Sequence, residues 1–519
     1  MQTTNSITSA AASSPGEGRR FRSCGWAVCL LWSMVAATLL AFVWHRWPVL
    51  DDDAMDFVPP MVTYAKDGSL VNAVNPLWSQ LDPVGGGRLI YHGFLYEMVV
   101  GKSTASATYP SIILTMGIIE VLALGACAFV LYRAARLVAG EFGWARFALV
   151  ALGIGGIASA LISLRGRPEP FAMLLVALAA GGMFLLKRRW HFFLVGVALG
   201  LMAATHPTGT LLCGPVAAVY ASTRCGAREW FAWLAKALVV SLAVFGITAI
   251  WYPYHIWEWV EGLLRHSSIV FAWDRRGRVL QYWLTVPRTA LYGPLYLVSL
   301  VCGLWLSWKF RDRIRFKAGF LLSGLAFLLP AYFYNVRNPE QNYDFILAPL
   351  VYGVLIVGAA VWLSLDKNAL PIRYRNLGMS LALTALTLTN LGFLRSAALF
   401  PFFLKHGLGY DQARARLQEI RAERPDRIDL DAGLFSLTED YRNLTIASDR
   451  TKEASLVVVQ QVNRGRLLPP QLENYELIED GFSRVVPRCL GVKLGNTVGG
   501  YNFAVYRRTD LQRKQTSHE

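Results

Sequence analysis

Three consecutive acids, Asp51-Asp52-Asp53, with Asp56 just behind them, are the residues of this chain best suited to chemistry. They follow the first long apolar run, Gly25–Trp44. Clustered carboxylates are costly near hydrocarbon, so a functional role is the default interpretation. One acid can act as a general base, or Asp52 and Asp53 can hold a divalent cation. The alternative is a solvated helix flank, which needs fewer acids than these.

Two further motifs offer groups that bind phosphate. Arg165-Gly166-Arg167-Pro168-Glu169 places Arg165 and Arg167 beside a predicted helix start, where guanidinium groups favour bidentate contact with a phosphate. The alternative is that Arg165 pairs with Glu169 and closes the loop. His206 lies between two short apolar runs and can donate to a phosphate or orient an acid. The alternative for His206 is a structural role in the turn.

A basic aromatic segment spans residues 251–288. Arginines such as Arg275 and Arg276 suit an anionic head group or a lipid-linked phosphate, and aromatic rings stack on sugars. The alternative is an ordinary interfacial belt. Arg337 is a further candidate phosphate contact, and Lys66 and His92 are other site candidates in the first loop.

Composition indicates what must position these residues. The 519 residues are 54% hydrophobic and 17% charged, with a mean hydropathy of +0.36, which is typical of a polytopic membrane protein. The net charge of +16 does not require a nucleic-acid partner, because the basic residues form short clusters between apolar runs. The cysteines show neither metal-ligand spacing nor a disulfide framework.

About eleven apolar runs are predicted to span a membrane, although several are shorter than the roughly 20 residues of a full crossing. They are Gly25–Trp44, Ile112–Tyr132, Phe147–Leu164, Phe171–Leu186, Phe192–Thr205, Thr208–Ala221, Leu234–Trp251, Leu291–Trp308, Phe320–Tyr334, Phe345–Leu365 and Leu377–Leu394. Basic clusters fall in every second loop, which predicts a cytosolic tail over residues 1–24 and an external C-terminus. All the candidate site residues then face the outer side. Glu120 is the one clearly intramembrane acid, with either a functional or a packing role.

Two regions outside the spans have predicted structure. The long outer loop, residues 45–110, carries Val58–Leu70 and Leu89–Val100, which read as helices lying in the interface. Residues 401–519 combine a charged helix, Asp411–Arg424, with short β-rich runs, which predicts a small α/β domain. That domain either binds a glycan or caps the membrane part.

The layout resembles the GT-C superfamily of membrane glycosyltransferases, in particular bacterial aminoarabinose transferases and protein O-mannosyltransferases. The resemblance rests on Asp51-Asp52-Asp53 after the first span, the long outer loop, Arg167-Pro168-Glu169 and the outer C-terminal domain. One departure is Leu89-Ile90-Tyr91-His92-Gly93, where the aminoarabinose-type members carry a Lys-Pro-Pro segment.

The resemblance implies an inverting transfer of a sugar from a polyprenyl-phosphate donor to a hydroxyl of an envelope glycan, lipid or protein. It implies that one of the three acids is the base, with Asp52 preferred, and that His206 and the arginines hold the leaving phosphate. Those arginines are Arg165, Arg167, Arg275, Arg276 and Arg337. The expected location is a bacterial inner membrane, with the site facing the periplasm.

Two other functions are alternatives to a transferase. A lipid or polysaccharide transporter predicts charges along a membrane path and repeated halves, and neither is visible in the sequence. An O-antigen ligase or polymerase usually lacks a large outer C-terminal domain. No P-loop or HExxH motif is present, so no soluble nucleotide donor is implied.

Overall fold

The structure is a computed structural model that describes residues 15–50, 53–72, 74, 82, 84–90, 92–138, 143–272, 312, 314–332, 372–423, 427–441, 444–446, 454–461 and 474–509. Several sequence predictions fall outside these residues. They are Asp51, Asp52, Arg275, Arg276, Arg337 and the predicted spans Leu291–Trp308 and Phe345–Leu365.

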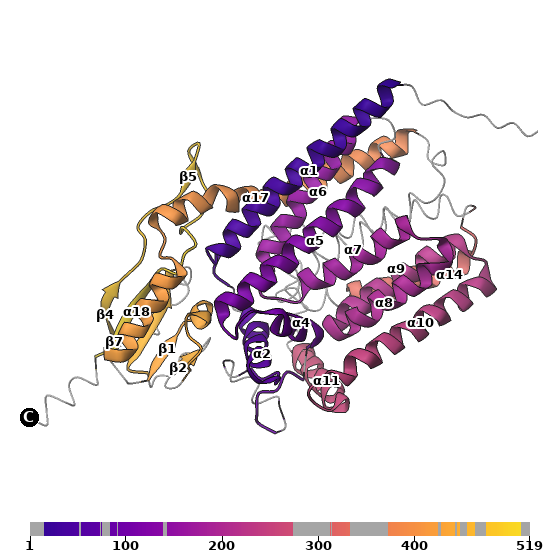
Figure 1. Cartoon of the computed structure of the whole chain (residues 1–519). Coiled ribbons are helices and arrows are strands. Elements are labelled where there is room, and N and C mark those ends of the chain that lie inside the picture. The colour runs from indigo at the N-terminus through magenta and orange to yellow at the C-terminus, as the bar shows by residue number, and fades with distance from the viewer. Residues whose placement is uncertain are drawn as a thin grey trace, which may run out of the picture.

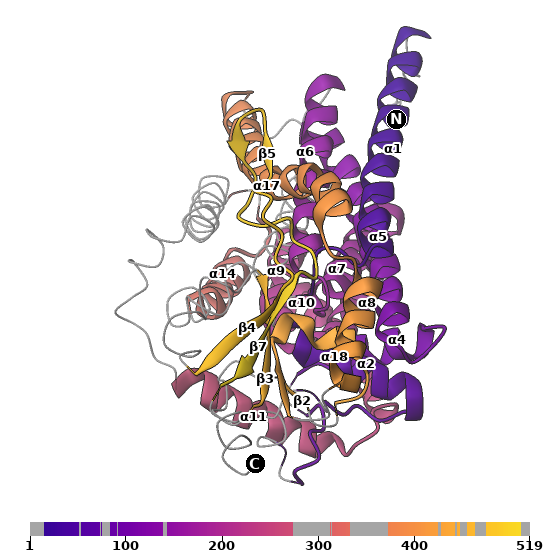
Figure 2. The ribbon, with the colours of Figure 1, turned by 90° about the vertical axis from the view of Figure 1, so that its left-hand side faces the viewer.

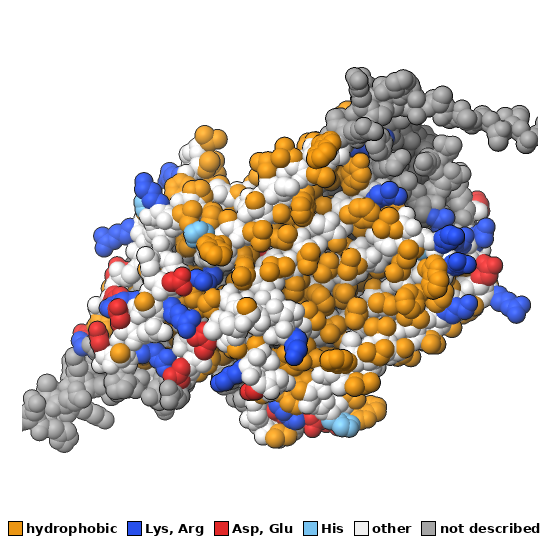
Figure 3. All heavy atoms as spheres, in the orientation of Figure 1, with side chains coloured by type: hydrophobic (Ala, Val, Ile, Leu, Met, Phe, Trp, Pro, Cys, Tyr) orange, Lys and Arg blue, Asp and Glu red, His pale blue; other side chains and the backbone are white. Residues whose placement is uncertain are grey.

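Long apolar helices form the body of the molecule (Figure 1). Among the described residues, four segments are long and apolar enough to cross a membrane. They are Gly25–Trp44 of α1 (Pro15–Trp44), Tyr109–Ala135 of α5 (Tyr109–Val138), α6 (Gly143–Ser163) and α10 (Ala227–Ile250). Hydrophobic side chains cover the face of the bundle seen in Figure 3. The prediction of an apolar, helical membrane protein is confirmed at this level.

The remaining bundle helices coincide in position with predicted apolar runs. They are α7 (Glu169–Leu185), α8 (His191–Thr205), α9 (Pro207–Arg224), α14 (Lys317–Tyr332) and α17 (Ile372–His406). A short 3-10 helix, η1 (Arg188–Trp190), precedes α8. α10 packs along α8, α17 along α6, and α5 along α7. α17 continues through Pro401 and ends only at His406.

Three shorter helices gather at one end of the bundle (Figure 1). They are α2 (Ala54–Asp67), α4 (Leu95–Ser103) and α11 (Ile256–Ala272). α2 and α4 overlap the two predicted interfacial helices. α11 occupies the first part of residues 251–288, a segment whose sequence indicated only a basic aromatic loop.

Basic loops meet at the other end of α8 and α9. Arg188 and Arg315 both donate to the main-chain carbonyl oxygen of Arg224, the latter at 3.2 Å. α8 begins at His191, close to this contact, and ends at Thr205 beside the helices of the outer loop. The basic loops and the candidate site therefore lie at opposite ends of the same helices.

A small α/β domain follows α17. α18 (Tyr410–Glu423) accompanies a five-stranded sheet of β1 (Ile428–Leu430), β2 (Leu444–Ile446), β3 (Leu456–Gln460), β4 (Tyr475–Asp480) and β7 (Phe503–Arg508). The strand order is β2-β1-β3-β7-β4. β1 is parallel to β2 and β3, whereas β7 is antiparallel to β3 and β4 (Figure 2). β5 (Arg488–Cys489) and β6 (Val492–Lys493) form a separate hairpin.

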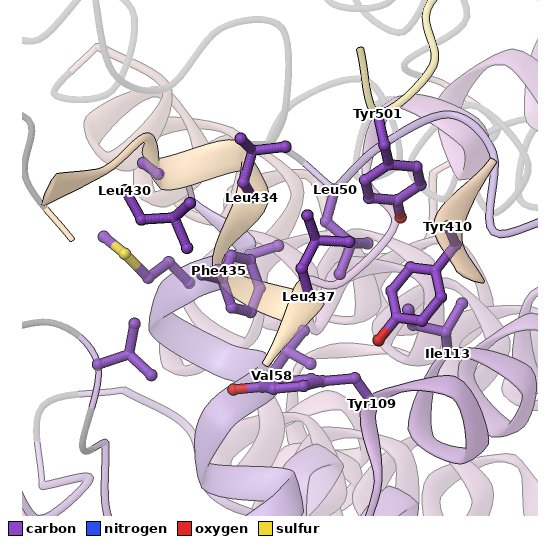
Figure 4. Packing of buried hydrophobic residues seen from close by; sticks show 14 of the residues in the cluster. Leu50, Val58, Tyr109, Ile113, Tyr410, Leu430, Leu434, Phe435, Leu437 and Tyr501 are labelled. Atoms are coloured by element: carbon purple, nitrogen blue, oxygen red, sulfur yellow. The ribbon is translucent and has the colours of Figure 1, made fainter. Parts of the chain in front are cut away.

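The α/β domain is docked on the bundle through a shared hydrophobic core (Figure 4). Phe435, from the 3-10 helix η5 (Ala432–Leu437), and Tyr501 lie in one cluster with Leu50 and Val58. The hydroxyl groups of Tyr109 and Tyr441 are hydrogen-bonded to each other. The core therefore holds Leu50, the residue directly before the acid cluster, in a fixed position.

Candidate functional site

Arg167 joins two acids that belong to separate sequence motifs. Its Nη1 donates to Oδ2 of Asp53, the residue directly before α2, across 114 positions of sequence. Its Nε and Nη2 donate to Oε1 of Glu169 at 3.1 and 3.0 Å. Because Glu169 begins α7, this one guanidinium group links the starts of two helices.

Gly166 explains why the arginine reaches Asp53. Its φ of +92° lies in the left-handed region that a side chain disfavours. A Cβ atom there would stand 2.6 Å from the Cβ of Ala54, in the first turn of α2. The absence of a side chain lets the loop between α6 and α7 pack directly on α2 and place Arg167 against Asp53.

His206 lies at the break between α8 and α9 and faces the same cluster. Its Nδ1 accepts a hydrogen bond from the Gly209 N–H at 3.0 Å, which assigns the proton of the neutral ring to Nε2. Nε2 is 3.8 Å from Oε1 of Glu169. Burial lowers the pKa of His206, Glu169 opposes this shift, and Arg167 adds to it. The ring is thus a neutral donor at neutral pH.

His92 brings a second imidazole to the cluster. Its ring centroid lies 4.9 Å from that of Phe57 on α2 and 4.9 Å from that of His266 on α11. Burial lowers the pKa of His92 well below its ordinary value, and His266, His206 and Arg167 lower it further. His266 carried no sequence signal, because it becomes part of the site only through the packing of α11.

The main chain at His92 is held from two sides. Trp259 of α11 donates its indole N–H to the His92 carbonyl oxygen at 2.6 Å. On the other side, Gly93 packs so closely on the end of α8 that a Cβ atom would overlap the Thr205 carbonyl oxygen. This approach needs a glycine and holds His92 next to the His206 turn.

Glu97, on α4, is an acid that the sequence did not single out. Its side chain is buried, and neither carboxylate oxygen has a hydrogen-bond partner among the described residues. Burial raises the pKa of Glu97 well above its ordinary value, and the charge of Glu169 adds to this effect. The fold therefore favours the protonated form of this carboxyl group. Its burial becomes visible only through the packing of α4.

Arg165 is enclosed in the interior instead. Its Nη2 is 2.9 Å from Oε2 of Glu120, and the two side chains are 2% and 1% exposed. Its Nη1 donates to the Trp47 carbonyl oxygen at 2.7 Å. Arg165 thus pairs with Glu120 rather than with Glu169, and Glu120 is a hydrogen-bonded packing residue. Arg165 and Arg167 together hold Trp47 and Asp53, the two sides of the acid segment.

Asp56 and Lys66, two further candidates, lie at different distances from Asp53. Asp56 lies in the first turn of α2, and its N–H donates to the Asp53 carbonyl oxygen at 3.0 Å. Lys66 lies in the last turn, about 20 Å farther along the helix at its usual rise. Within the described residues no group of three His, Cys, Asp or Glu is arranged to hold a metal ion, and Asp51 and Asp52 lie outside that set.

An ion-pair network ties the outer loop to α11. Arg88 Nη2 lies 2.8 Å from Asp82 Oδ1, and its Nη1 lies 2.8 Å from Glu258 Oε2. Burial raises the pKa of Asp82, but hydrogen bonds from Arg88 and the Val84 N–H outweigh this and lower it to about 2. This network fixes α11, and with it His266, beside the cluster. No sequence motif indicates this pairing.

The side chains of the cluster differ in their exposure to solvent. The Asp53 side chain is 49% exposed, whereas Arg167 and Glu169 are 7% and 2% exposed. One guanidinium group faces two carboxylates, and the nearby imidazoles are neutral, so negative charge is in excess. The arrangement can present an oriented carboxylate to a hydroxyl group or to a cation. No known protein family, curated protein or solved structure matches this chain.

Proposed function

We propose that this chain is a membrane glycosyltransferase of the GT-C type. It moves a sugar from a polyprenyl-phosphate donor to a hydroxyl of an envelope glycan, lipid or protein. The contact between Asp53 and Arg167 carries the proposal. It joins the acid segment after the first long apolar helix to the arginine loop, the two motifs on which the family resemblance rests.

The proposed reaction inverts the configuration at the anomeric carbon of the sugar. A carboxylate removes the proton of the acceptor hydroxyl while that oxygen attacks the anomeric carbon. The bond from the anomeric carbon to the phosphate oxygen breaks, and polyprenyl phosphate leaves. Asp51, Asp52 or Asp53 is the base. Arg167 supports this role by fixing Asp53, Glu169 in turn fixes Arg167, and His206 lies 3.8 Å from Glu169.

Charge decides what else the site needs. The excess of carboxylates in the described cluster repels a phosphate, so binding of the donor requires further positive charge. Arg275, Arg276 and Arg337 are the proposed sources. A divalent cation is the alternative source: Asp52 and Asp53 would hold it, and it would supply positive charge for the phosphate.

The proposed topology has about eleven spans, a cytosolic N-terminus and an external C-terminal domain in a bacterial inner membrane. Two observations support it. The basic loops meet at Arg224, and the cluster around Arg167 lies at the far end of α8 and α9. By the positive-inside rule, the Arg224 end is the cytosolic one and the site faces the periplasm.

A gene deletion tests the proposal directly. Envelope glycans and lipids of the deletion strain are compared with the parent by mass spectrometry, and a missing sugar is the expected result. The strain is then complemented with the wild type or with Asp51→Asn, Asp52→Asn or Asp53→Asn. Asp411→Asn is the matched control, because Asp411 is an exposed acid of α18 in the α/β domain, where it pairs with Arg46 from the segment after α1.

The expected result is that the wild type and the control restore the sugar, while at least one of the other variants does not. If all three restore it, the base lies elsewhere. If deletion changes no glycan or lipid, the transferase proposal fails and transport becomes the better explanation.

A further inference from the structure

The β5–β6 hairpin belongs spatially to the helix bundle. It takes no part in the five-stranded sheet and lies beside α17 in both ribbon views (Figures 1 and 2). Arg395 of α17 donates its Nε to the Leu494 carbonyl oxygen at the base of the hairpin. Leu494 also packs against the hydrophobic core that α1, α6 and α17 share. The base of the hairpin is thus anchored to the bundle.

The anchoring point lies near one end of a membrane-spanning segment. The Phe393 N–H of α17 donates to Ser159 Oγ at 2.6 Å, and α6 ends at Ser163. Arg395 is two residues beyond Phe393. The same stretch of α17 exposes Leu391 and Leu394, at 59% and 58%. The hairpin therefore joins the bundle where the bundle surface is apolar.

The tip of the hairpin is apolar and fully exposed, and its base is basic. Leu490 is 99% exposed and Val492 is 66% exposed. Arg488 and Lys493 face each other across the strand pair, and both are exposed. Like charges opposite one another destabilise a hairpin, unless an anion lies between or beside them. An apolar tip above a cationic collar is typical of segments that enter a lipid interface.

The backbone of the turn does not favour leucine. Leu490 has a φ of +48° and Gly491 a φ of +82°, so both central residues of this two-residue turn are left-handed. Such turns favour Asn-Gly, because a bulky side chain is strained at positive φ. Folding alone would be served better by asparagine at position 490. The turn therefore carries an exposed apolar side chain that its own backbone geometry does not require.

We propose that the β5–β6 hairpin inserts its Leu490 tip into the lipid bilayer. Leu490 and Val492 then lie at the boundary between head groups and acyl chains, and Arg488 and Lys493 contact anionic lipid phosphates. The hairpin then fixes the α/β domain to the membrane. This inference needs only a membrane protein and is independent of the proposed transferase activity.

Cys489, one residue from the tip, allows a direct depth measurement. The full chain keeps Cys489 as its one cysteine, with the other six replaced by alanine or serine. A nitroxide is attached in nanodiscs of phosphatidylethanolamine and phosphatidylglycerol. Oxygen, which concentrates in lipid, is expected to relax the label several-fold more strongly than a water-soluble nickel chelate. Glu419→Cys, exposed on α18, gives the aqueous reference.

Two results would overturn the proposal. One is a Cys489 label with the same accessibility ratio as the Glu419→Cys label, which means a tip in water. The other is exclusion of both reagents, which means a tip covered by protein.

A second variant separates insertion from folding. Leu490→Asn suits the left-handed turn better than the native residue, so folding is preserved while the apolar tip is lost. The label at Cys489 is expected to shift towards the aqueous reference, with an unchanged yield of folded protein. An unchanged label depth would show that Leu490 does not anchor the hairpin in lipid.

Discussion

Arg165 and Arg167 stand two residues apart in one loop, yet they occupy opposite environments. Arg165 is closed in with Glu120 in the interior of the bundle. Arg167 shares its guanidinium group between buried Glu169 and half-exposed Asp53. Gly166, with its left-handed backbone, turns the chain between them. One arginine therefore stabilises the helix packing and the other orients an accessible acid.

Two arginines of one motif can therefore have different roles. A buried ion pair must balance a large loss of hydration, so its geometry tolerates little change. A pair that is open to solvent on one side loses less hydration and leaves its carboxylate free to meet a substrate. The following variants test this division between the two arginines.

The largest effect on stability is expected from Arg165→Ala. Removing one partner of a buried pair leaves Glu120 uncompensated and costs about 3–5 kcal/mol of the free energy of unfolding. Thermal unfolding in nanodiscs measures the loss. The control is the double variant Arg165→Met with Glu120→Leu, which should recover much of it, because apolar residues can replace such a pair. A stable Arg165→Ala protein would contradict the interior role.

Arg167→Lys is expected to reduce sugar transfer by about 10²-fold or more, as does the loss of one oriented donor in other active sites. Lysine keeps the charge but cannot join Asp53 and Glu169 at once in fixed geometry. The rate is followed by mass spectrometry of the proposed glycan product, and the yield of folded protein is measured in parallel. Normal transfer by this variant would exclude a role for Arg167.

Acid is expected to lower the free energy of unfolding through the histidines near Arg167. Burial lowers the pKa values of His206, His92 and His266 in the folded protein. Below the ordinary value of about 6.5, the unfolded chain therefore binds more protons, and the free energy of unfolding falls as pH decreases.

Unfolding measured between about pH 5 and pH 8 should show this slope, and His206→Gln should reduce it. The exposed residue His255 supplies the control variant, His255→Gln, which should leave the slope unchanged. A slope that is equal in both variants would show that His206 is not buried as a neutral ring.

Glu97→Gln is expected to stabilise the protein at neutral pH by a few degrees of melting temperature. The raised pKa of Glu97 means that the folded state holds a proton that the unfolded state releases. The contribution of Glu97 to stability is complete below its ordinary pKa and is lost as pH rises. Glutamine mimics the neutral acid, so the gain should disappear in acid. Glu419→Gln, on the surface, should show no such gain.

The smallest effect is expected from Asp53→Asn on folding. The Asp53 side chain is half exposed in its pair with Arg167. The free energy of unfolding should therefore change by about 1 kcal/mol or less. Asp411→Asn breaks a similar exposed pair with Arg46 and serves for comparison. A large loss of stability in Asp53→Asn alone would mean that the outer pair is as structural as the inner one.

Much of the architecture could be predicted from sequence. Apolar runs such as Gly25–Trp44 are long enough to identify membrane helices, because hydrophobicity along one segment is a local property. The short β-rich runs in residues 401–519 likewise predicted a small C-terminal sheet region, which is confirmed. The helix α11 was missed because its apolar face is interrupted by aromatic and basic residues that also suit an interfacial loop.

Hydropathy and composition predict an apolar membrane protein with acids, arginines and a histidine between its helices. Which of these residues meet depends on how the helices pack. The fold pairs Arg165 with Glu120, joins Arg167 to Asp53 and Glu169, buries Glu97 and places His266 against His92. Hydrophobicity is a property of one stretch of chain, whereas these contacts also join separate segments, such as Arg165 to Glu120 across 45 positions and Arg167 to Asp53 across 114.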